Sequence, residues 1–294
     1  MTRDLLDTPL HTLGSEQPRR NAERRDVAAY DRRMEFQGKN VVVTGAGRGI
    51  GAALATEFHT RGANVVLADL AGADEVAANL GDRAAGLIAD VSTEEGNRQL
   101  VAQANAAFGP IDLFFANAGV GTGRELDTTT EDDWDLAFDV NVHAHRWAAK
   151  YLVPDWLERG EGYFCSTASA AGLLAQIGSG AYTLTKRAAV AFAEWMAITY
   201  GDRGIRVTCL CPQGVNTAML HAGDDEVAGT NVVKAAGAVL EPDDVAVMVA
   251  DTIEREQFFV LPHPEVAGYM QLKASDPERW LGGMRKLQRR VMGG

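Results

Sequence analysis

Tyr182 and Lys186 are the pair of residues with the clearest potential for chemistry in this sequence. They lie four residues apart, about one helical turn, so both side chains would project from one helix face. A phenol has a pKa of about 10 and exchanges protons poorly at neutral pH, but a neighbouring ammonium group favours the phenolate and lowers that pKa. The pair is therefore a candidate general acid or base. The alternative is a packed tyrosine beside a solvated lysine.

A glycine-rich loop in the N-terminal half is typical of a dinucleotide-binding site. Residues 41–43 are valines, as in a buried parallel strand, and a helix is expected from Ile50. Glycines around this junction would let the backbone approach a pyrophosphate at the helix N-terminus, and they are Gly45, Gly47, Gly49 and Gly51. A second strand over 64–68 ends in Asp69, where an acid would hold a ribose hydroxyl. The alternative is a purely structural glycine turn.

With these motifs in order, residues 36 to about 262 resemble the short-chain dehydrogenases/reductases. Thr44 to Gly51 is similar to the family's TGxxxGxG loop, and Tyr182 with Lys186 is similar to its YxxxK pair. The other matching positions are Asp90 and Val91, the segment Asn117, Ala118 and Gly119, and the tetrad residues Asn141 and Ser169. Two positions depart from the family pattern. Ala116 replaces an asparagine, and Gln213 replaces a glycine in the segment that borders the nicotinamide.

The resemblance implies hydride transfer between a secondary alcohol or ketone and a nicotinamide. Tyr182 would be the general acid or base, and Lys186 would lower its pKa and hold the nicotinamide ribose. Ser169 would hydrogen-bond the substrate oxygen, with Ser166 as a competitor for that role and a helix-cap serine as the alternative. Asn141 would hold a water that relays protons, with a capped helix kink as the alternative.

The resemblance also implies a full set of cofactor contacts. They are Gly45, Gly47, Arg48, Gly49, Ile50, Gly51, Asp69, Asp90, Val91, Asn117, Ala118, Gly119, Tyr182, Lys186, Pro212, Gly214, Val215 and Thr217. Two of these residues bear on cofactor choice. Asp69 would bind ribose hydroxyls and repel a 2′-phosphate, which favours NAD. Arg48 lies where NADP-preferring members of the family often carry a basic residue. We expect the effect of the Asp69 carboxylate on cofactor preference to be the larger one, so that NADP is the poorer cofactor.

Other readings remain open from the sequence. The same scaffold could be a dinucleotide-binding regulator without catalysis, or a lyase, epimerase or dehydratase that uses NAD transiently. His143 and His145 lie close to Asn141, and we expect them to pack between helices and assign no metal. Cys209 and Cys211 lack the CxxC spacing of a metal or redox pair.

Composition excludes several classes of partner. The chain has 294 residues, 46% of them hydrophobic, and a net charge of −12, which argues against binding nucleic acid or an anionic membrane. No apolar run is long enough to span a membrane, and the N-terminus lacks a secretory leader. Three cysteines without a disulfide framework suggest buried, reduced thiols and a cytoplasmic protein. We expect the substrate to be a small, apolar secondary alcohol or ketone. We expect the protein to form a homotetramer or a homodimer.

Strands alternate with helices, which predicts a doubly wound, Rossmann-type parallel sheet of about seven strands. The expected strands are 40–44, 64–68, 85–89, 111–116, 162–166, 205–210 and 257–261. The expected helices are 50–61, 74–80, 94–108, 131–158, 180–200 and 242–255, with capping boxes from Ser92 to Glu95 and from Thr130 to Asp133.

Three further segments surround the core of this domain, which we place at 36–262. Residues 1–35 read as a polar extension, with Val27, Tyr30 and Met34 at helical spacing. Residues 213–240 form a long segment of the kind that is usually functional, and the resemblance implies that it is a substrate lid. Its apolar lining would be Met219, Leu220, Val232 and Val233, and the alternative is an ordinary surface helix pair. Residues 263–294 form a tail whose last helix would begin at Pro277 with Asp276 as its cap. Leu173, Leu174, Gln176 and Ile177 complete a mainly apolar substrate pocket.

Overall fold

The computed structural model describes residues 33–122, 125–221 and 237–292. The chain divides into two units, Met1–Arg33 and Met34–Gly294. Val27 and Tyr30 of the predicted extension, and Val232 and Val233 of the predicted lid, lie outside the described residues.

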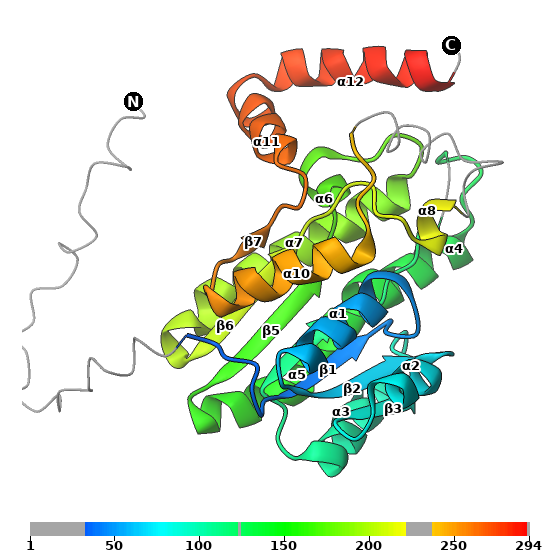
Figure 1. Ribbon diagram of the computed structural model, residues 1–294. Helices are drawn as coiled ribbons and strands as arrows, with labels where there is room; N and C mark the ends of the chain where they lie inside the picture. The colour runs from blue at the N-terminus through cyan, green and yellow to red at the C-terminus, as the bar shows by residue number, and fades with distance from the viewer. Residues whose placement is uncertain (1–32, 123–124, 222–236, 293–294) are drawn as a thin grey trace, which may run out of the picture. The chain divides into compact units, whose positions relative to one another are not determined.

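A seven-stranded sheet forms the centre of the second unit, and all its strand pairs are parallel (Figure 1). Its spatial order is β3-β2-β1-β4-β5-β6-β7. The strands are β1 (Asn40–Thr44), β2 (Asn64–Asp69), β3 (Ala84–Ile88), β4 (Leu113–Ala116), β5 (Gly162–Thr167), β6 (Ile205–Leu210) and β7 (Phe259–Val260). The order reverses between β1 and β4, and ligands bind at such a switch point, beyond the carboxyl ends of the strands.

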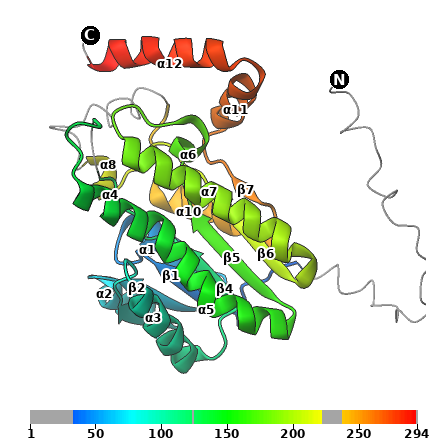
Figure 2. The same cartoon turned by 180° about the vertical axis from the view of Figure 1, so that it is seen from behind.

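Helices cover both faces of the sheet, as Figures 1 and 2 show from opposite sides. On one face lie α1 (Gly49–Thr60), α2 (Ala73–Leu80) and α10 (Pro242–Glu254). On the other lie α3 (Glu94–Phe108), α4 (Glu131–Phe138), α5 (Ala144–Arg159) and α7 (Gly180–Tyr200). Each face of the sheet has its own hydrophobic core. Because side chains alternate along a strand, Val42 packs into the core under α3, α5 and α7, while Val41 and Val43 pack into the core under α1, α2 and α10. Both faces are buried, which explains why the strands are continuously apolar.

The predicted doubly wound fold is confirmed, and each predicted strand overlaps an observed one. Two local predictions were wrong. The helix expected over 131–158 is instead α4, a π-helix at Asp139–His143 and then α5. The cap of α3 is Thr93, whose hydroxyl accepts the Gly96 N–H, whereas Ser92 bonds to Asp90. The capping box from Thr130 to Asp133 is present.

Short helices at the carboxyl end of the sheet were not predicted. They are α6 (Ala170–Leu174), α8 (Ala218–His221) and α11 (Glu265–Ser275). The last helix, α12 (Pro277–Met292), begins where the sequence predicts, and the Asp276 carboxylate accepts the Arg279 N–H. No helix in the described ranges is both long and apolar enough to cross a membrane.

Candidate active site

The glycine loop after β1 is held by hydrogen bonds from neighbouring strands. The Thr44 hydroxyl accepts the N–H groups of Asn117 and Ala118, both at 3.0 Å. The Asn117 side-chain amide donates to the Thr44 carbonyl at 3.0 Å. These bonds join the ends of β1 and β4 at the switch point of the sheet. They fix the loop in a shape that depends on glycine.

Close backbone approach explains two of the loop glycines. A Cβ atom on Gly51 would lie 2.0 Å from the Gly45 carbonyl oxygen, and one on Gly47 would lie 2.1 Å from the Ala71 carbonyl oxygen. The Gly47 N–H donates to the Asp69 carboxylate at 2.9 Å, so the acid at the end of β2 also orders the loop. α1 begins directly behind it, at Gly49, and its first N–H groups make a site for an anion such as a pyrophosphate.

A large pocket of about 2050 Å³ extends from this loop to the predicted catalytic residues. The predicted residues that line it are Gly45, Arg48, Gly49, Ile50, Gly51, Asp69, Asp90, Val91, Asn117, Ala118, Gly119, Ser169, Tyr182, Lys186, Pro212, Val215 and Thr217. Gly47, Gly214 and Asn141 are the predicted site residues that do not line it. Gly47 shapes the loop from behind, and the Gly214 carbonyl accepts the Leu240 N–H.

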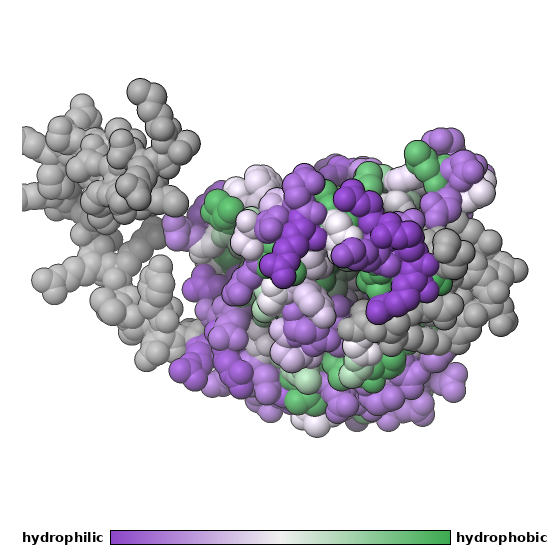
Figure 3. Space-filling view, turned by 90° about the horizontal axis from the view of Figure 1, so that it is seen from above, coloured by the Kyte–Doolittle hydropathy of each residue, from purple (hydrophilic) through white to green (hydrophobic). Residues whose placement is uncertain are grey.

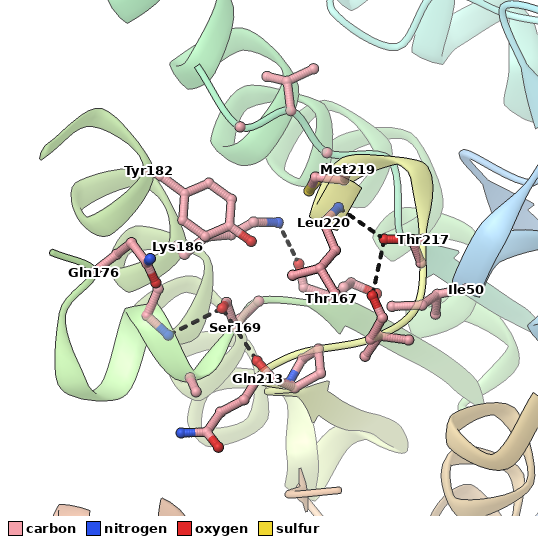
Figure 4. A pocket seen from close by; sticks show the side chains of 18 of the residues that line it. Ile50, Thr167, Ser169, Gln176, Tyr182, Lys186, Gln213, Thr217, Met219 and Leu220 are labelled. Carbon is pink, nitrogen blue, oxygen red and sulfur yellow. Dashed lines mark hydrogen bonds between the residues drawn. The ribbon is translucent and has the colours of Figure 1, made fainter. Parts of the chain in front are cut away.

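Tyr182 and Ser169 face each other across the substrate end of this pocket (Figure 4). Tyr182 stands in the first turn of α7, where the Ser179 hydroxyl caps the helix by accepting its N–H. Burial raises the pKa of Tyr182 above 10, and the nearby Ser169 hydroxyl lowers it in part. Burial outweighs the lowering of the Tyr182 pKa that the sequence predicts from Lys186. Desolvation dominates, and the phenol is protonated at neutral pH.

Lys186 lies one turn further along α7 with its side chain beneath the Tyr182 ring. Its Nζ is 5.7 Å from the centre of that ring and donates to the Thr167 carbonyl at 2.9 Å (Figure 4). Because the side chain is buried, desolvation lowers the pKa of Lys186 to about 8. Thr167 was not predicted as a site residue, since nothing local in the sequence marks a carbonyl at a strand end as a lysine acceptor.

Ser169 combines the two readings that the sequence left open. It follows β5 and caps α6, where its hydroxyl accepts the Ala171 N–H at 3.1 Å. The same hydroxyl donates to the Pro212 carbonyl at 3.3 Å and lines the pocket. Its rival Ser166 is fully buried and bonds to His145 Nδ1 at 3.1 Å. Ser166 therefore does not compete for the substrate.

Asn141 lies in the π-helix, behind the pocket. Its amide donates to the Val120 carbonyl at 2.9 Å and to the Thr185 hydroxyl at 3.1 Å, and its oxygen accepts the Val120 N–H at 2.9 Å. These bonds hold the side chain at the kink of the helix, and the water relay through Asn141 stays a prediction. A π-bulge of this kind is frequent at functional sites. Through Thr185 it also contacts α7, the helix that carries Tyr182 and Lys186.

His143 and His145 do not line the pocket, whereas Gln213 does. His145 is buried, and desolvation lowers its pKa to about 3, so it is a neutral core residue. His143 packs between Phe138 and Trp147. The Gln213 side chain extends away from Tyr182 (Figure 4) and lies near Gly237, where a Cβ atom would be 3.3 Å from its oxygen. The described residues contain no group of acids, histidines and cysteines that could hold a metal.

Comparison with known proteins identifies the family. The model described as short chain dehydrogenase matches residues 39–228. Meso-2,3-butanediol dehydrogenase of Serratia marcescens is 34% identical over 231 residues, covering 77% of this chain and 92% of that protein. 2,5-Dichloro-2,5-cyclohexadiene-1,4-diol dehydrogenase of Sphingobium indicum (strain UT26S) is 37% identical over 221 residues, covering 72% and 88%.

A solved structure is similar over most of its length. It is the crystal structure of a short chain dehydrogenase/reductase from Burkholderia phymatum in complex with NAD. The two structures match with a TM-score of 0.76 and 30% sequence identity. The match covers 83% of this chain and 96% of the Burkholderia phymatum chain. This chain belongs to the short-chain dehydrogenase/reductase family.

The buried lysine makes a prediction about stability. A lysine whose pKa falls from 10.5 to about 8 on folding costs about 3 kcal/mol while it stays charged. Lys186→Met should therefore raise the free energy of unfolding at pH 7 by about 1–3 kcal/mol, since losing the bond to Thr167 offsets part of the gain. Urea unfolding measures it. Because the cost is complete below pH 8 and is relieved as pH rises toward 10.5, the advantage of the variant should shrink across that window.

Lys150→Met is the matched control. Lys150 is exposed and ion-paired with Glu94, which raises the pKa of that lysine, so its loss should not stabilise the protein at any pH. An unfolding free energy that falls for Lys186→Met at both pH 7 and pH 10 would contradict this account of Lys186.

Proposed function

We propose that this protein is an NAD-dependent oxidoreductase that interconverts a secondary alcohol and its ketone. The observation that carries the proposal is the meeting of Tyr182, Ser169 and Lys186 in the pocket that also contains the glycine loop. A proton-transfer group and a dinucleotide cradle in one cavity suit transfer of a hydride and a proton to or from the same carbon–oxygen group.

Tyr182 and Ser169 would divide the work on the substrate oxygen. When bound, the nicotinamide would accept or supply the hydride. In ketone reduction, Ser169 would orient the carbonyl oxygen and Tyr182 would donate the proton, a role that fits its raised pKa. In alcohol oxidation, the phenolate would take the hydroxyl proton. Lys186 would favour that form, because its ammonium group lies 5.7 Å from the centre of the phenol ring.

NAD rather than NADP is the cofactor that Asp69 favours. Its carboxylate ends β2 beside the glycine loop and lines the pocket, where it would repel a 2′-phosphate and accept ribose hydroxyls. Arg48 lies in the same part of the pocket and is exposed. Support comes from the Burkholderia phymatum relative, whose structure is described as a complex with NAD.

The substrate class follows from the pocket and from the relatives. The residues that line its substrate end include the apolar Leu174, Met219, Leu220 and Leu272 and the uncharged polar Gln176 and Ser179. The two relatives above are named as dehydrogenases of alcohols with hydroxyl groups on secondary carbons.

The proposal also covers assembly and location. The protein would form a homotetramer or a homodimer. The buried, free cysteines Cys165, Cys209 and Cys211 agree with a reducing, cytoplasmic location.

Cofactor reduction tests the proposal. The purified protein is incubated with a panel of apolar secondary alcohols and either NAD or NADP, and absorbance of the reduced cofactor is followed. We expect turnover with NAD and a lower kcat/KM with NADP. Faster turnover with NADP would contradict the role given to Asp69. Cofactor binding with no net reduction would favour a regulator, or a lyase or epimerase on this scaffold.

A further inference from the structure

One face of the C-terminal helix α12 brings positive charge to the substrate end of the pocket. Arg279, Lys286 and Arg290 all line the cavity. They are seven and four residues apart, so they share one face of the helix. Seen from above, strongly hydrophilic side chains lie across this end of the molecule (Figure 3). These three residues are called the cationic face below.

The cationic face has no ion-pair partner among the residues that the structure describes. The acids that line the pocket belong to other elements, and they are Asp69, Asp90, Glu241 and Asp243. Asp69 bonds to the glycine loop and Glu241 to Asn216, so neither is directed to α12. The three side chains are exposed, and in a chain of net charge −12 they place positive charge on one wall of the pocket, where an anionic group could bind.

Contacts of the tail place the cationic face on the substrate side. In α11, the Lys273 ammonium donates to the Leu173 carbonyl at 2.6 Å, which ties the tail to α6 and so to Ser169. The rings of Tyr269 in α11 and Trp280 in α12 lie 6.1 Å apart and connect the two helices. The cationic face would therefore bind an anionic group of the substrate. The pyrophosphate of the cofactor would bind elsewhere, at the glycine loop and the N-terminus of α1.

Apolar side chains accompany the cations along the tail. Trp280, Met284 and Leu287 line the same pocket, as does Leu272 from α11. We propose, resting on the function above, that the substrate is an anionic amphiphile. It is a secondary alcohol or ketone whose apolar body lies along these residues and whose distal carboxylate, or a similar anion, binds the cationic face. This substrate differs from the small, apolar alcohol or ketone that the sequence predicts, because it carries an anionic group.

The test compares an acid with its neutral ester in matched variants. The probes are 8-hydroxynonanoate and its methyl ester, measured by calorimetry for binding and by NAD reduction for turnover. Lys286→Gln with Arg290→Gln removes two charges from the cationic face. Arg285→Gln with Arg289→Gln removes two charges at the same spacing from positions of α12 that do not line the pocket.

We expect the wild type to bind the acid more tightly than the ester, with a preference that weakens as salt is added. The Lys286/Arg290 variant should lose about tenfold in affinity and kcat/KM for the acid and little for the ester. The Arg285/Arg289 variant should retain both. Equal binding of acid and ester by the wild type, or equal losses in both variants, would overturn the proposal.

Binding and turnover separate this proposal from the function on which it rests. Preferential binding of the acid that only the Lys286/Arg290 variant loses would support the anion site even if the probe is not oxidised. Oxidation of acid and ester with the same kcat/KM would support the oxidoreductase and overturn the anion site. A parallel fall in affinity for NAD would assign the cations to the cofactor and would also overturn it.

Discussion

Tyr182→Phe is expected to lower kcat by about 10²–10⁴-fold, the range that loss of a general acid or base gives. The variant removes one oxygen from the substrate end of the pocket and leaves the ring over Lys186 in place. Affinity for NAD should therefore stay close to that of the wild type. Steady-state kinetics with the best alcohol of the panel, together with calorimetry for NAD, measure both quantities.

Tyr200→Phe is the matched control, because it removes the same atom from the far end of the same helix. The Tyr200 ring packs edge-on against Trp195, and its hydroxyl has no hydrogen bond within the described residues. We expect near-native kcat for this variant. Near-native kcat for Tyr182→Phe would instead show that another group moves the proton.

Gly51→Ala is the second change with a large expected effect, and it acts on cofactor binding. The new Cβ atom would meet the Gly45 carbonyl oxygen at 2.0 Å and the Asn117 amide nitrogen at 2.6 Å, so the loop must open. Overpacking of this kind costs about 1–3 kcal/mol, which corresponds to a rise of about 5- to 150-fold in Kd for NAD if the strain falls on the loop. Calorimetric titration with NAD measures it.

Gly201→Ala provides the comparison for the glycine loop. Gly201 has open space around the added Cβ atom and a negative φ of −56°, so alanine fits there without strain. It should bind NAD as the wild type does. If Gly51→Ala also kept native affinity, the tight packing behind the loop would have no part in holding the cofactor.

Local patterns predict the parts of the site that are built from consecutive residues. The valines before Gly45 place β1, and the glycines that follow place the loop, because both signals depend on neighbours in the chain. Tyr182 and Lys186 are brought together by helical spacing alone. For these residues, sequence position and spatial position are linked by the geometry of one element.

Features that depend on distant contacts were missed or misjudged. The π-helix around Asn141 forms where that side chain bonds to the backbone of Val120, a contact between segments 21 residues apart. The pKa of Tyr182 was expected to fall because only its neighbour Lys186 is visible in the sequence. Burial by the whole pocket reverses the direction.

For the C-terminal tail, the sequence predicts the helix but not its position at the pocket. The helix of residues 277–292 and its cap at Asp276 follow from local signals, and both are present. Nothing in the spacing says that Arg279, Lys286 and Arg290 line the pocket. Their position depends on the contact of α11 with α6.

Transfer of a labelled hydrogen tests the central claim most directly. A secondary alcohol oxidised in the panel is deuterated at its carbinol carbon and incubated with NAD and the protein, and the products are examined by NMR. The account predicts deuterium at C4 of the nicotinamide, with one labelled NADH formed for each ketone. Deuterium that appears in water or stays in the organic product, without accumulation of reduced cofactor, would contradict an oxidoreductase and favour a lyase or epimerase.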